Sequence, residues 1–323
     1  MIEVKNLTKR YGNKLAVDDI SFTVKEGEIV GFLGPNGAGK STTMNILTGY
    51  LSATAGDVTI NGYNILDDPY MAKKNIGFLP EIAPLYLDMT VKEYLNFVFD
   101  LKKCALDREK HLKEICELVS ITEVYKRVIK NLSKGYKQRV GFAQALIGNP
   151  PVLILDEPTV GFDPRQIIEI RNLIKNLGKK HTVILSSHIL SEIQATCQRV
   201  IVINNGKIVA NDTPENLSEN MNDKKQISVI ITGPPKEVQK ALSESKVFKS
   251  VIIDEKSDGQ ARFILEYDDN VQPQKALFAI LAKHDWNMLE LKNFNSSLEN
   301  IFMEIIEKED DTEGEIKNNE SSI

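Results

Sequence analysis

The stretch that decides the fold is GPNGAGKS, residues 34–41, which fits the pattern G-x-x-x-x-G-K-[ST]. An apolar run, EIVGFL (28–33), precedes it, and a helical pattern, KSTTMNILTG (40–49), follows it. Glycines let backbone N–H groups converge on an anion, and the start of a helix adds partial positive charge. A chance glycine-rich turn would not require a strand before it and a helix after it. The sequence therefore predicts a phosphate-binding loop at the end of a buried strand.

Each position of this loop predicts a contact with a magnesium-bound nucleoside triphosphate. Lys40 can reach the β- and γ-phosphates, Ser41 can ligate Mg²⁺, and Thr42 can reach the α-phosphate. The remaining residues would surround the phosphates with their backbone: Gly34, Pro35, Asn36, Gly37, Ala38 and Gly39. The loop alone therefore supplies nine candidate nucleotide-binding residues.

A carboxylate pair follows a second apolar run, in PVLILDEP (151–158). Asp156 ends the run, where it can hold the metal or a water molecule of its hydration shell. Glu157 is one residue further on, where it can orient or deprotonate an attacking water. An isolated Asp-Glu after a strand would more often be a helix cap. Beside a phosphate loop, the same pair predicts a hydrolytic site.

The first two-thirds of the chain alternates short β-branched runs with amphipathic stretches, which predicts an α/β domain with a largely parallel sheet. The expected strands include 28–33, 152–156, 182–187 and 200–204, and the expected helices include 91–103, 107–119 and 164–178. Asn-Gly pairs in INGYNI (60–65) and INNGKIV (203–209) predict β-hairpins.

A polar stretch at 211–226 suggests a linker or a frayed helix, and a second pattern follows it. Residues 226–294 have the order β-α-β-β-α-β, which predicts a small α+β domain. A last helix is expected at 297–309, before an acidic end without aromatic residues that is typical of disorder. The predicted boundaries are 1–217 for the first domain, 218–307 for the accessory domain and 308–323 for the tail.

Composition excludes several classes of protein. A formal net charge of −5 argues against a surface built for nucleic acid, although a local basic stripe remains compatible with it. The three cysteines form no metal-ligand pattern and fit a reducing cytoplasm. The beginning of the sequence has no signal-peptide core, and no run reaches the roughly 20 apolar residues that span a bilayer. We therefore expect a cytoplasmic protein without direct membrane insertion.

Residues 1–217 resemble the ATP-binding cassette, the nucleotide-binding subunit of ABC transporters. Besides the phosphate loop and the carboxylate pair, the resemblance rests on ordered motifs: Tyr11 in KRYG, Glu81 in GFLPEIAPLY (77–86), LSKGY (132–136), Asp163 in VGFDP (160–164) and His188 in SSH (186–188). The resemblance implies a P-loop NTPase fold with a mixed sheet, a helical signature subdomain and an antiparallel β subdomain.

The resemblance also implies roles for single residues. Tyr11 would stack on adenine, although an isolated tyrosine is more often a packing residue. His188 would contact the γ-phosphate, and Ser133 and Gly135 of the signature would contact a nucleotide. Glu81 takes the place of a glutamine that reaches the metal or the attacking water. The implied catalytic residues are Glu157, His188 and Glu81, the implied metal ligands are Ser41, Asp156 and Glu81, and the implied cofactors are ATP and Mg²⁺.

Three departures from the family pattern bear on activity. Glu81 keeps an oxygen but adds a negative charge, which leaves open a cassette that binds ATP only for regulation. Lys134 and Tyr136 replace a glycine and the glutamine of the usual signature. A lysine there could approach phosphates or point into solvent, and the sequence does not decide between these. Phe162 replaces a leucine and should change packing alone.

The resemblance implies that two cassettes, most simply two identical copies, enclose two ATP molecules. They would lie on the cytoplasmic face of the cell membrane and drive a separate multi-span permease for export. Residues 81–94 would contact that permease, although Leu85, Tyr86, Leu87 and Met89 could equally form a small loop core. NSSLENIFMEI (295–305) is similar to a motif of exporter-type cassettes. The alternative is a soluble ABC-type ATPase that acts on ribosomes or nucleic acid. Such proteins usually carry paired cassettes, coiled coils or zinc inserts, which this sequence lacks, so we expect no nucleic-acid partner.

Overall fold

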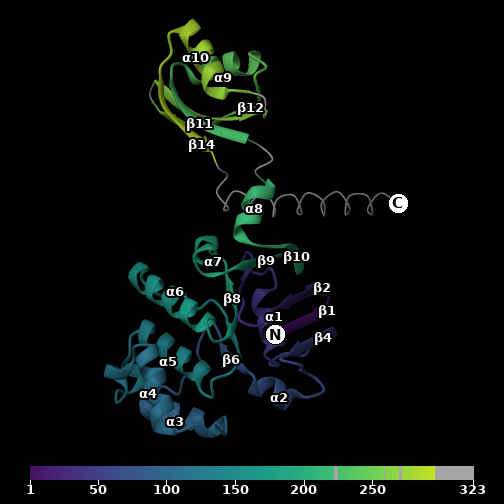
Figure 1. Cartoon of the computed structure of the whole chain (residues 1–323), viewed down its shortest axis with the longest axis vertical. Coiled ribbons are helices and arrows are strands. Elements are labelled where there is room, and N and C mark those ends of the chain that lie inside the picture. The colour runs from purple at the N-terminus through teal and green to yellow at the C-terminus, as the bar shows by residue number, and fades with distance from the viewer. Residues whose placement is uncertain (222–224, 258, 269–270, 295–323) are drawn as a thin grey trace. The chain divides into compact units, whose positions relative to one another are not determined.

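The computed structural model describes residues 1–221, 225–257, 259–268 and 271–294 (Figure 1). The described chain forms two compact units, the first Met1–Pro214 and the second beginning at Glu215. The tail, the expected helix at 297–309 and the motif at 295–305 lie outside the described residues.

The first unit is built on a six-stranded sheet. Its order is β10 (Lys207–Asp212), β9 (Arg199–Asn204), β3 (Ile29–Leu33), β8 (Thr182–Ser187), β7 (Val152–Leu155) and β6 (Ile76–Leu79). All neighbours are parallel except β10, which pairs antiparallel with β9. Every residue of β3, β7 and β8 is buried, which explains their continuous apolar sequences. The predicted α/β fold with a mixed sheet is confirmed.

A four-stranded antiparallel sheet forms a second layer of this unit. Its order is β2 (Lys14–Val24), β1 (Ile2–Tyr11), β4 (Ala55–Ile60) and β5 (Tyr63–Asn64). Both predicted hairpins form. Asn61 and Gly62 link β4 to β5, and Asn205 and Gly206 link β9 to β10. All four of these residues have positive φ, as a tight two-residue turn requires.

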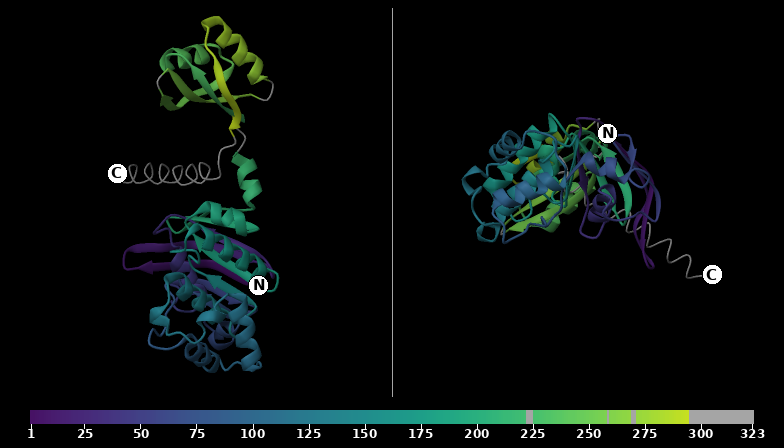
Figure 2. Two further views of the ribbon diagram at one scale, coloured as in Figure 1. Left: turned by 90° about the vertical axis from the view of Figure 1, so that its left-hand side faces the viewer. Right: turned by 90° about the horizontal axis from the view of Figure 1, so that it is seen from below.

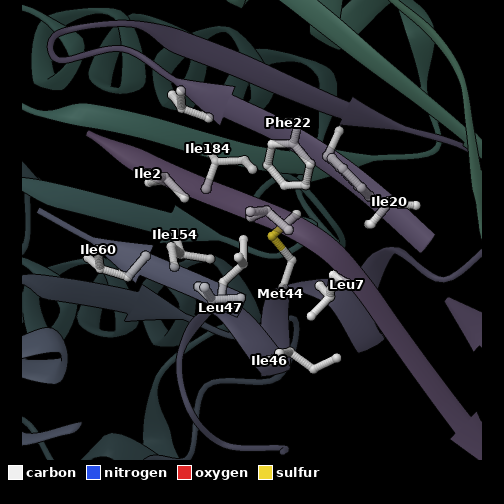
Figure 3. Close-up of a cluster of buried hydrophobic side chains, with 14 of the residues drawn as sticks. Ile2, Leu7, Ile20, Phe22, Met44, Ile46, Leu47, Ile60, Ile154 and Ile184 are labelled. Carbon is white, nitrogen blue, oxygen red and sulfur yellow. The ribbon is translucent and has the colours of Figure 1, made fainter. Parts of the chain in front are cut away.

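Helix α1 (Lys40–Leu47) lies in the apolar core between the two sheets (Figure 3). Its Met44 and Leu47 pack in one cluster with Phe22 of β2 and Ile154 and Ile184 of the central strands. Burying each such side chain stabilises the fold by about 1.5–3 kcal/mol. The core therefore fixes the helix, and with it the loop that precedes its first residue.

A helical part covers residues 91–146, on the side of the unit away from the antiparallel sheet (Figures 1 and 2). It contains α3 (Val91–Leu101), α4 (Arg108–Leu118), the 3₁₀ turns η1 (Thr122–Val124) and η2 (Ile129–Asn131), and α5 (Lys134–Leu146). A capping box between Thr90 and Glu93 starts α3, and the Asp107 carboxylate starts α4. Helix α5 approaches β6 closely, because a Cβ on Gly141 would lie 2.7 Å from Leu79 Cδ1.

Three further helices are described in the first unit, α2 (Pro69–Lys74), α6 (Pro164–Gly178) and α7 (Leu190–Thr196), and α8 (Pro214–Met221) begins at its last residue. Asp163 caps α6 through hydrogen bonds from the backbone of Arg165 and Gln166. The polar stretch predicted as a linker or frayed helix contains the end of β10 and then α8. Within the described ranges, no helix combines the length and the apolar character needed to cross a membrane.

The second unit has the predicted β-α-β-β-α-β order: β11 (Lys225–Thr232), α9 (Pro235–Glu244), β12 (Phe248–Ser257), β13 (Gln260–Tyr267), α10 (Pro273–His284) and β14 (Met288–Phe294). The antiparallel sheet order is β12-β13-β11-β14. Helices α9 and α10 pack on one of its faces, where Leu242 and Leu277 meet Val229 and Phe263 in a core separate from that of the first unit (Figure 2).

Candidate nucleotide-binding and hydrolysis site

The site forms where four neighbouring parallel strands end at one edge of the central sheet. The register pairs Leu33 of β3 with Ser187 of β8, and Leu79 of β6 with Leu155 of β7. The next residues along the chain are the phosphate loop, His188, Pro80-Glu81 and Asp156-Glu157. Sites of α/β proteins characteristically form at the carboxyl ends of strands. The fold thus gathers segments that are far apart in the sequence.

The phosphate loop lies between β3 and the first turn of α1. Gly39 is the N-cap residue of α1 and has φ 111°, and a Cβ there would lie 2.5 Å from Ala16 O. Only glycine fits this position, because of both its φ and this close approach. Lys40 is 6% exposed, and its Nζ donates to Gly34 O at 2.8 Å and to Pro35 O at 3.2 Å. The loop therefore holds its lysine inward.

Asp156 is the buried carboxylate of the site. Its Oδ1 accepts hydrogen bonds from Ser186 Oγ at 2.5 Å and from Ser41 Oγ at 3.3 Å. Burial raises the pKa of Asp156 above its ordinary value, and the charge of Glu157 acts in the same direction. The two hydroxyl hydrogen bonds and the charge of Lys40 oppose that rise.

Glu157 lies between two basic groups. Its Oε1 is 3.6 Å from Lys40 Nζ, and its Oε2 is 2.9 Å from His188 Nδ1. The residue is buried and has φ 47°, a backbone conformation uncommon outside glycine and asparagine. A hydrogen bond of 2.9 Å from Glu157 N to Ser186 Oγ helps to hold it. Strained backbone of this kind is characteristic of active sites.

A cavity of about 410 Å³ opens at this edge. Of the residues predicted from sequence, it is lined by Tyr11, Asn36, Gly37, Gly39, Lys40, Ser41, Thr42, Glu81, Glu157 and His188. Gly34, Pro35, Ala38 and Asp156 are not part of this lining, but the carbonyls of Gly34 and Pro35 accept hydrogen bonds from Lys40, and Asp156 accepts one from Ser41. Tyr11 is 46% exposed, with Lys9 Nζ 5.2 Å from its ring centroid, so that it can present its ring to a planar base.

The signature residues lie apart from this cavity. Ser133 is the N-cap of α5 and accepts a hydrogen bond from Tyr136 N at 3.4 Å. Gly135 lines a different cavity, of about 600 Å³, together with Gln166 and other residues of the α5 and α6 surfaces. Ser133 and Gly135 therefore contribute nothing to the phosphate-loop cavity of their own chain.

Lys134 lies across the loop that joins β7 to α6. A Cβ on Gly161, which has φ 84°, would be 2.2 Å from Lys134 Nζ and 2.6 Å from its Cδ. Phe162 lies close to Gly135, because a Cβ there would be 3.2 Å from its ring. Lys134 is exposed, and the end of its side chain lies beside Gly161. Its stem covers the loop that follows Glu157.

The donor set suits magnesium held together with a nucleotide. Mg²⁺ in such sites takes one or two carboxylates, a hydroxyl, phosphate oxygens and waters. Ser41 and Asp156 supply one hydroxyl and one buried carboxylate in contact with each other, and Glu81 lines the same cavity. Over the described ranges, no group of three or more His, Cys, Asp and Glu side chains gathers as a metal site. The residues present therefore fit a metal that also needs the phosphates.

Sequence reasoning missed several residues that build the site. Lys14, Ala16 and Val160 also line the cavity, and Ser186 connects Asp156 to the backbone of Glu157. For Ser186 a signal existed, since it lies two residues before His188 at the end of a predicted strand. Lys14 and Ala16 come from β2 in the antiparallel sheet, and no local pattern in the sequence places them there.

The fold and site define a P-loop ATPase of the cassette type. The profile of the family described as "ABC transporter" matches residues 17–160. The chain is 41% identical over 224 residues to the uncharacterized ABC transporter ATP-binding protein YhcH of Bacillus subtilis (strain 168), covering 68% of this chain and 73% of the relative. The chain belongs to the ATP-binding proteins of ABC transporters.

Two further comparisons give a relative that aligns with nearly the whole chain and a solved cassette bound to the products of ATP hydrolysis. The linearmycin resistance ATP-binding protein LnrL of Bacillus subtilis (strain 168) is 32% identical over 309 residues, covering 94% of this chain and 98% of the relative. The dimeric post-hydrolysis state of the ATP-binding cassette MJ0796, bound to ADP and Pi, has a TM-score of 0.61 and 27% identity, covering 66% of this chain and 98% of that one. The protein is the ATP-binding subunit of an ABC transporter, and an ATPase.

Proposed function

We propose that two copies of this chain bind two MgATP molecules between them, that hydrolysis reopens the pair, and that this cycle drives a separate membrane permease for export. The observation that carries the proposal is the separation of Gly135 from the phosphate loop, which line different cavities of one chain. A second copy can bring its signature to the γ-phosphate, where the N-terminus of α5 favours negative charge.

In this proposal each residue at the sheet edge has one task. The phosphate loop and Lys40 bind the phosphates, and Tyr11 supports the base. Ser41 and Asp156, with Glu81 nearby, would hold Mg²⁺, which neutralises phosphate charge when bound. Glu157 accepts a proton from the attacking water. His188, held by Glu157 at 2.9 Å, contacts the γ-phosphate.

The dimer is tested with the full chain carrying Glu157→Gln, which should bind ATP without hydrolysing it. This variant should double in mass on addition of MgATP, measured by size exclusion with light scattering. Adding Ser133→Arg should abolish the doubling, because arginine fills the surface that meets the partner's nucleotide. Ser52→Arg, the same substitution on an exposed part of the first unit, is the control. ATP-dependent doubling that survives Ser133→Arg would contradict the arrangement.

A second surface supports the permease partner. A cavity of about 660 Å³ is lined by Tyr50, Phe78, Ile82 and Lys102, among other residues. Ile82 is 83% exposed and Tyr50 is 79% exposed. Of the predicted contact segment, Tyr86 is also exposed, and its ring packs 5.3 Å from that of Phe97. Contiguous exposed apolar side chains of this kind mark interaction sites.

The permease is tested by affinity purification of the chain with the multi-span protein encoded beside its gene. Wild type should retain that protein, and Ile82→Asp should lose it without losing ATP-dependent dimerisation of the Glu157→Gln protein. Export is supported by LnrL, a relative of nearly full-length similarity whose name refers to resistance. Recovery of ribosomes or nucleic acid in place of a membrane protein would favour the soluble alternative and reject the permease.

A further inference from the structure

Glu192 is a buried carboxylate that the proposed mechanism does not use. It lies in α7, four residues after His188, and is 4% exposed. Among the described residues no lysine, arginine or histidine pairs with it, and its only partners are two hydroxyl groups, Thr159 Oγ1 and Ser187 Oγ. Burying a carboxylate without a counter-charge is costly. Stability therefore does not explain why a carboxyl group is buried at position 192.

Its two partners belong to the two loops that carry the reacting groups. Thr159 is two residues after Glu157 and donates to Glu192 Oε2. Ser187 directly precedes His188 and donates to the same oxygen at 3.3 Å. Ser187 Oγ in turn accepts a hydrogen bond of 3.0 Å from Ile189 N, which closes the turn around His188. One carboxylate oxygen thus ties both loops together.

The effect of this connection falls on the contact between Glu157 and His188. These side chains meet at 2.9 Å, and each extends from a loop that leaves the sheet at a different strand. Backbone pairing of β7 with β8 ends at Leu155 and Leu185, before either residue is reached. The hydrogen bonds to Glu192 therefore supply side-chain connections between the loops beyond the end of the ladder.

We infer that Glu192 is a positioning residue for hydrolysis, which holds the loop after Glu157 against the turn of His188 and so keeps their side chains in contact. The inference rests on the proposed roles of those two residues. Both hydrogen bonds need an acceptor oxygen at this position, which the amide oxygen of glutamine can supply and methionine cannot. Positional errors of about 1 Å at a reacting group cost on the order of 100-fold in rate.

The test separates positioning from folding. Glu192→Met replaces the buried carboxyl group with an apolar side chain of similar size and removes the acceptor of both hydrogen bonds. Combining it with Thr159→Val also removes the unpaired hydroxyl. The double variant should unfold no earlier than wild type on heating, and both variants should hydrolyse ATP at least ten-fold more slowly, with KM for ATP within about three-fold of wild type. Thr196→Val, which changes another buried residue of α7, should leave kcat unchanged.

A second measurement does not depend on hydrolysis. In the nucleotide-free full chain, the imidazole resonances of His188 are assigned by their loss in His188→Ala. In Glu192→Met they should move toward their position in Glu157→Ala, because both changes end the same contact. Resonances and kcat that match wild type would overturn the inference. Moved resonances, in a protein whose Glu157→Gln variant hydrolyses ATP normally, would instead uphold the positioning and reject the proposed role of Glu157.

Discussion

His188 Nδ1 lies 2.9 Å from Glu157 Oε2, and the other oxygen of the same carboxylate lies 3.6 Å from Lys40 Nζ. One carboxylate therefore contacts the two basic groups that the fold brings from the ends of β3 and β8. This arrangement lets a single side chain accept a proton while its neighbours bind phosphate. It also makes the site sensitive to small changes at any of the three residues.

Glu157→Gln is expected to lower kcat by about 10²–10⁴-fold, the range associated with loss of a general base. Because glutamine keeps the shape and one hydrogen-bond acceptor, ATP binding should persist. Phosphate release measured at saturating MgATP gives kcat, and equilibrium dialysis gives binding. Glu26→Gln, at an exposed position of the same unit, should behave as wild type. Unchanged turnover in Glu157→Gln would show that another group activates the water.

Gly161→Ala is expected to destabilise the first unit by about 1–3 kcal/mol. Alanine would adopt φ 84° with strain, and its Cβ would meet the side chain of Lys134. Lys134→Gly in the same chain removes the clash but not the backbone strain. The double variant should therefore unfold in denaturant later than the sum of the single changes predicts. Strict additivity would mean that Lys134 does not cover Gly161 in solution.

Glu81→Gln is expected to change kcat by less than about ten-fold. Glu81 lines the nucleotide cavity but is exposed, and glutamine retains an oxygen at the same reach. Steady-state phosphate release at several Mg²⁺ concentrations tests this and also detects a role in holding the metal. A gain well beyond ten-fold would mean that Glu81 suppresses hydrolysis, as in a cassette that binds ATP for regulation.

Much of the fold follows from local sequence. Continuous apolar runs predict the buried parallel strands β3, β7 and β8. Asn-Gly pairs predict the hairpins, and the glycine pattern predicts the phosphate loop. The edge of the sheet where the site forms follows from parallel topology once the strands are placed. Local pattern therefore predicts β3, β7 and β8, whereas β6, which leads to Glu81, is not among the predicted strands.

The missed features depend on tertiary contacts. The bridge from Thr159 through Glu192 to Ser187 joins residues up to 33 positions apart, and nothing in their spacing predicts it. The position of the Lys134 side chain could not be predicted from its neighbours in the sequence either, because Gly161, which it lies beside, belongs to another loop. The polar stretch 211–226 predicts a linker or a frayed helix, and helix α8 lies within it. Pattern reasoning thus fails where side chains from different loops meet.

We expect that destabilising the second unit lowers its own resistance to urea without changing ATP hydrolysis by the first unit. The protein has one tryptophan, Trp286, which lies in the second unit and stacks on His284 with ring centroids 4.5 Å apart. Phe263→Ala empties a fully buried site and should cost about 3–5 kcal/mol in that unit. Tryptophan fluorescence should then show a lower urea midpoint, while ATPase activity at low urea stays unchanged. Parallel loss of both signals would show that the units fold as one.

Lys102 is the C-cap residue of α3, and its amine lies at the end of helix α5. Its Nζ donates to the carbonyl oxygens of Gln144, Ala145 and Ile147, so it satisfies the acceptors that a helix terminus leaves open. Burial lowers the pKa of Lys102 from 10.5 to about 8, while Cys104 acts weakly in the opposite direction. As pH rises, this lysine therefore loses its proton at a lower pH in the folded protein than in the unfolded chain.

Between pH 8 and 10.5, Lys102 binds more protons in the unfolded state than in the folded state. The contribution of Lys102 to the free energy of unfolding therefore rises with pH in this range. The gain is at most about 3 kcal/mol. Lys102→Met removes the titration and leaves three carbonyls unpaired, so it should be less stable than wild type at every pH. The difference between the two should widen between pH 8 and 10, measured by urea unfolding. Lys92→Met, exposed on α3, should show a constant difference, and a constant difference for Lys102→Met would contradict the lowered pKa.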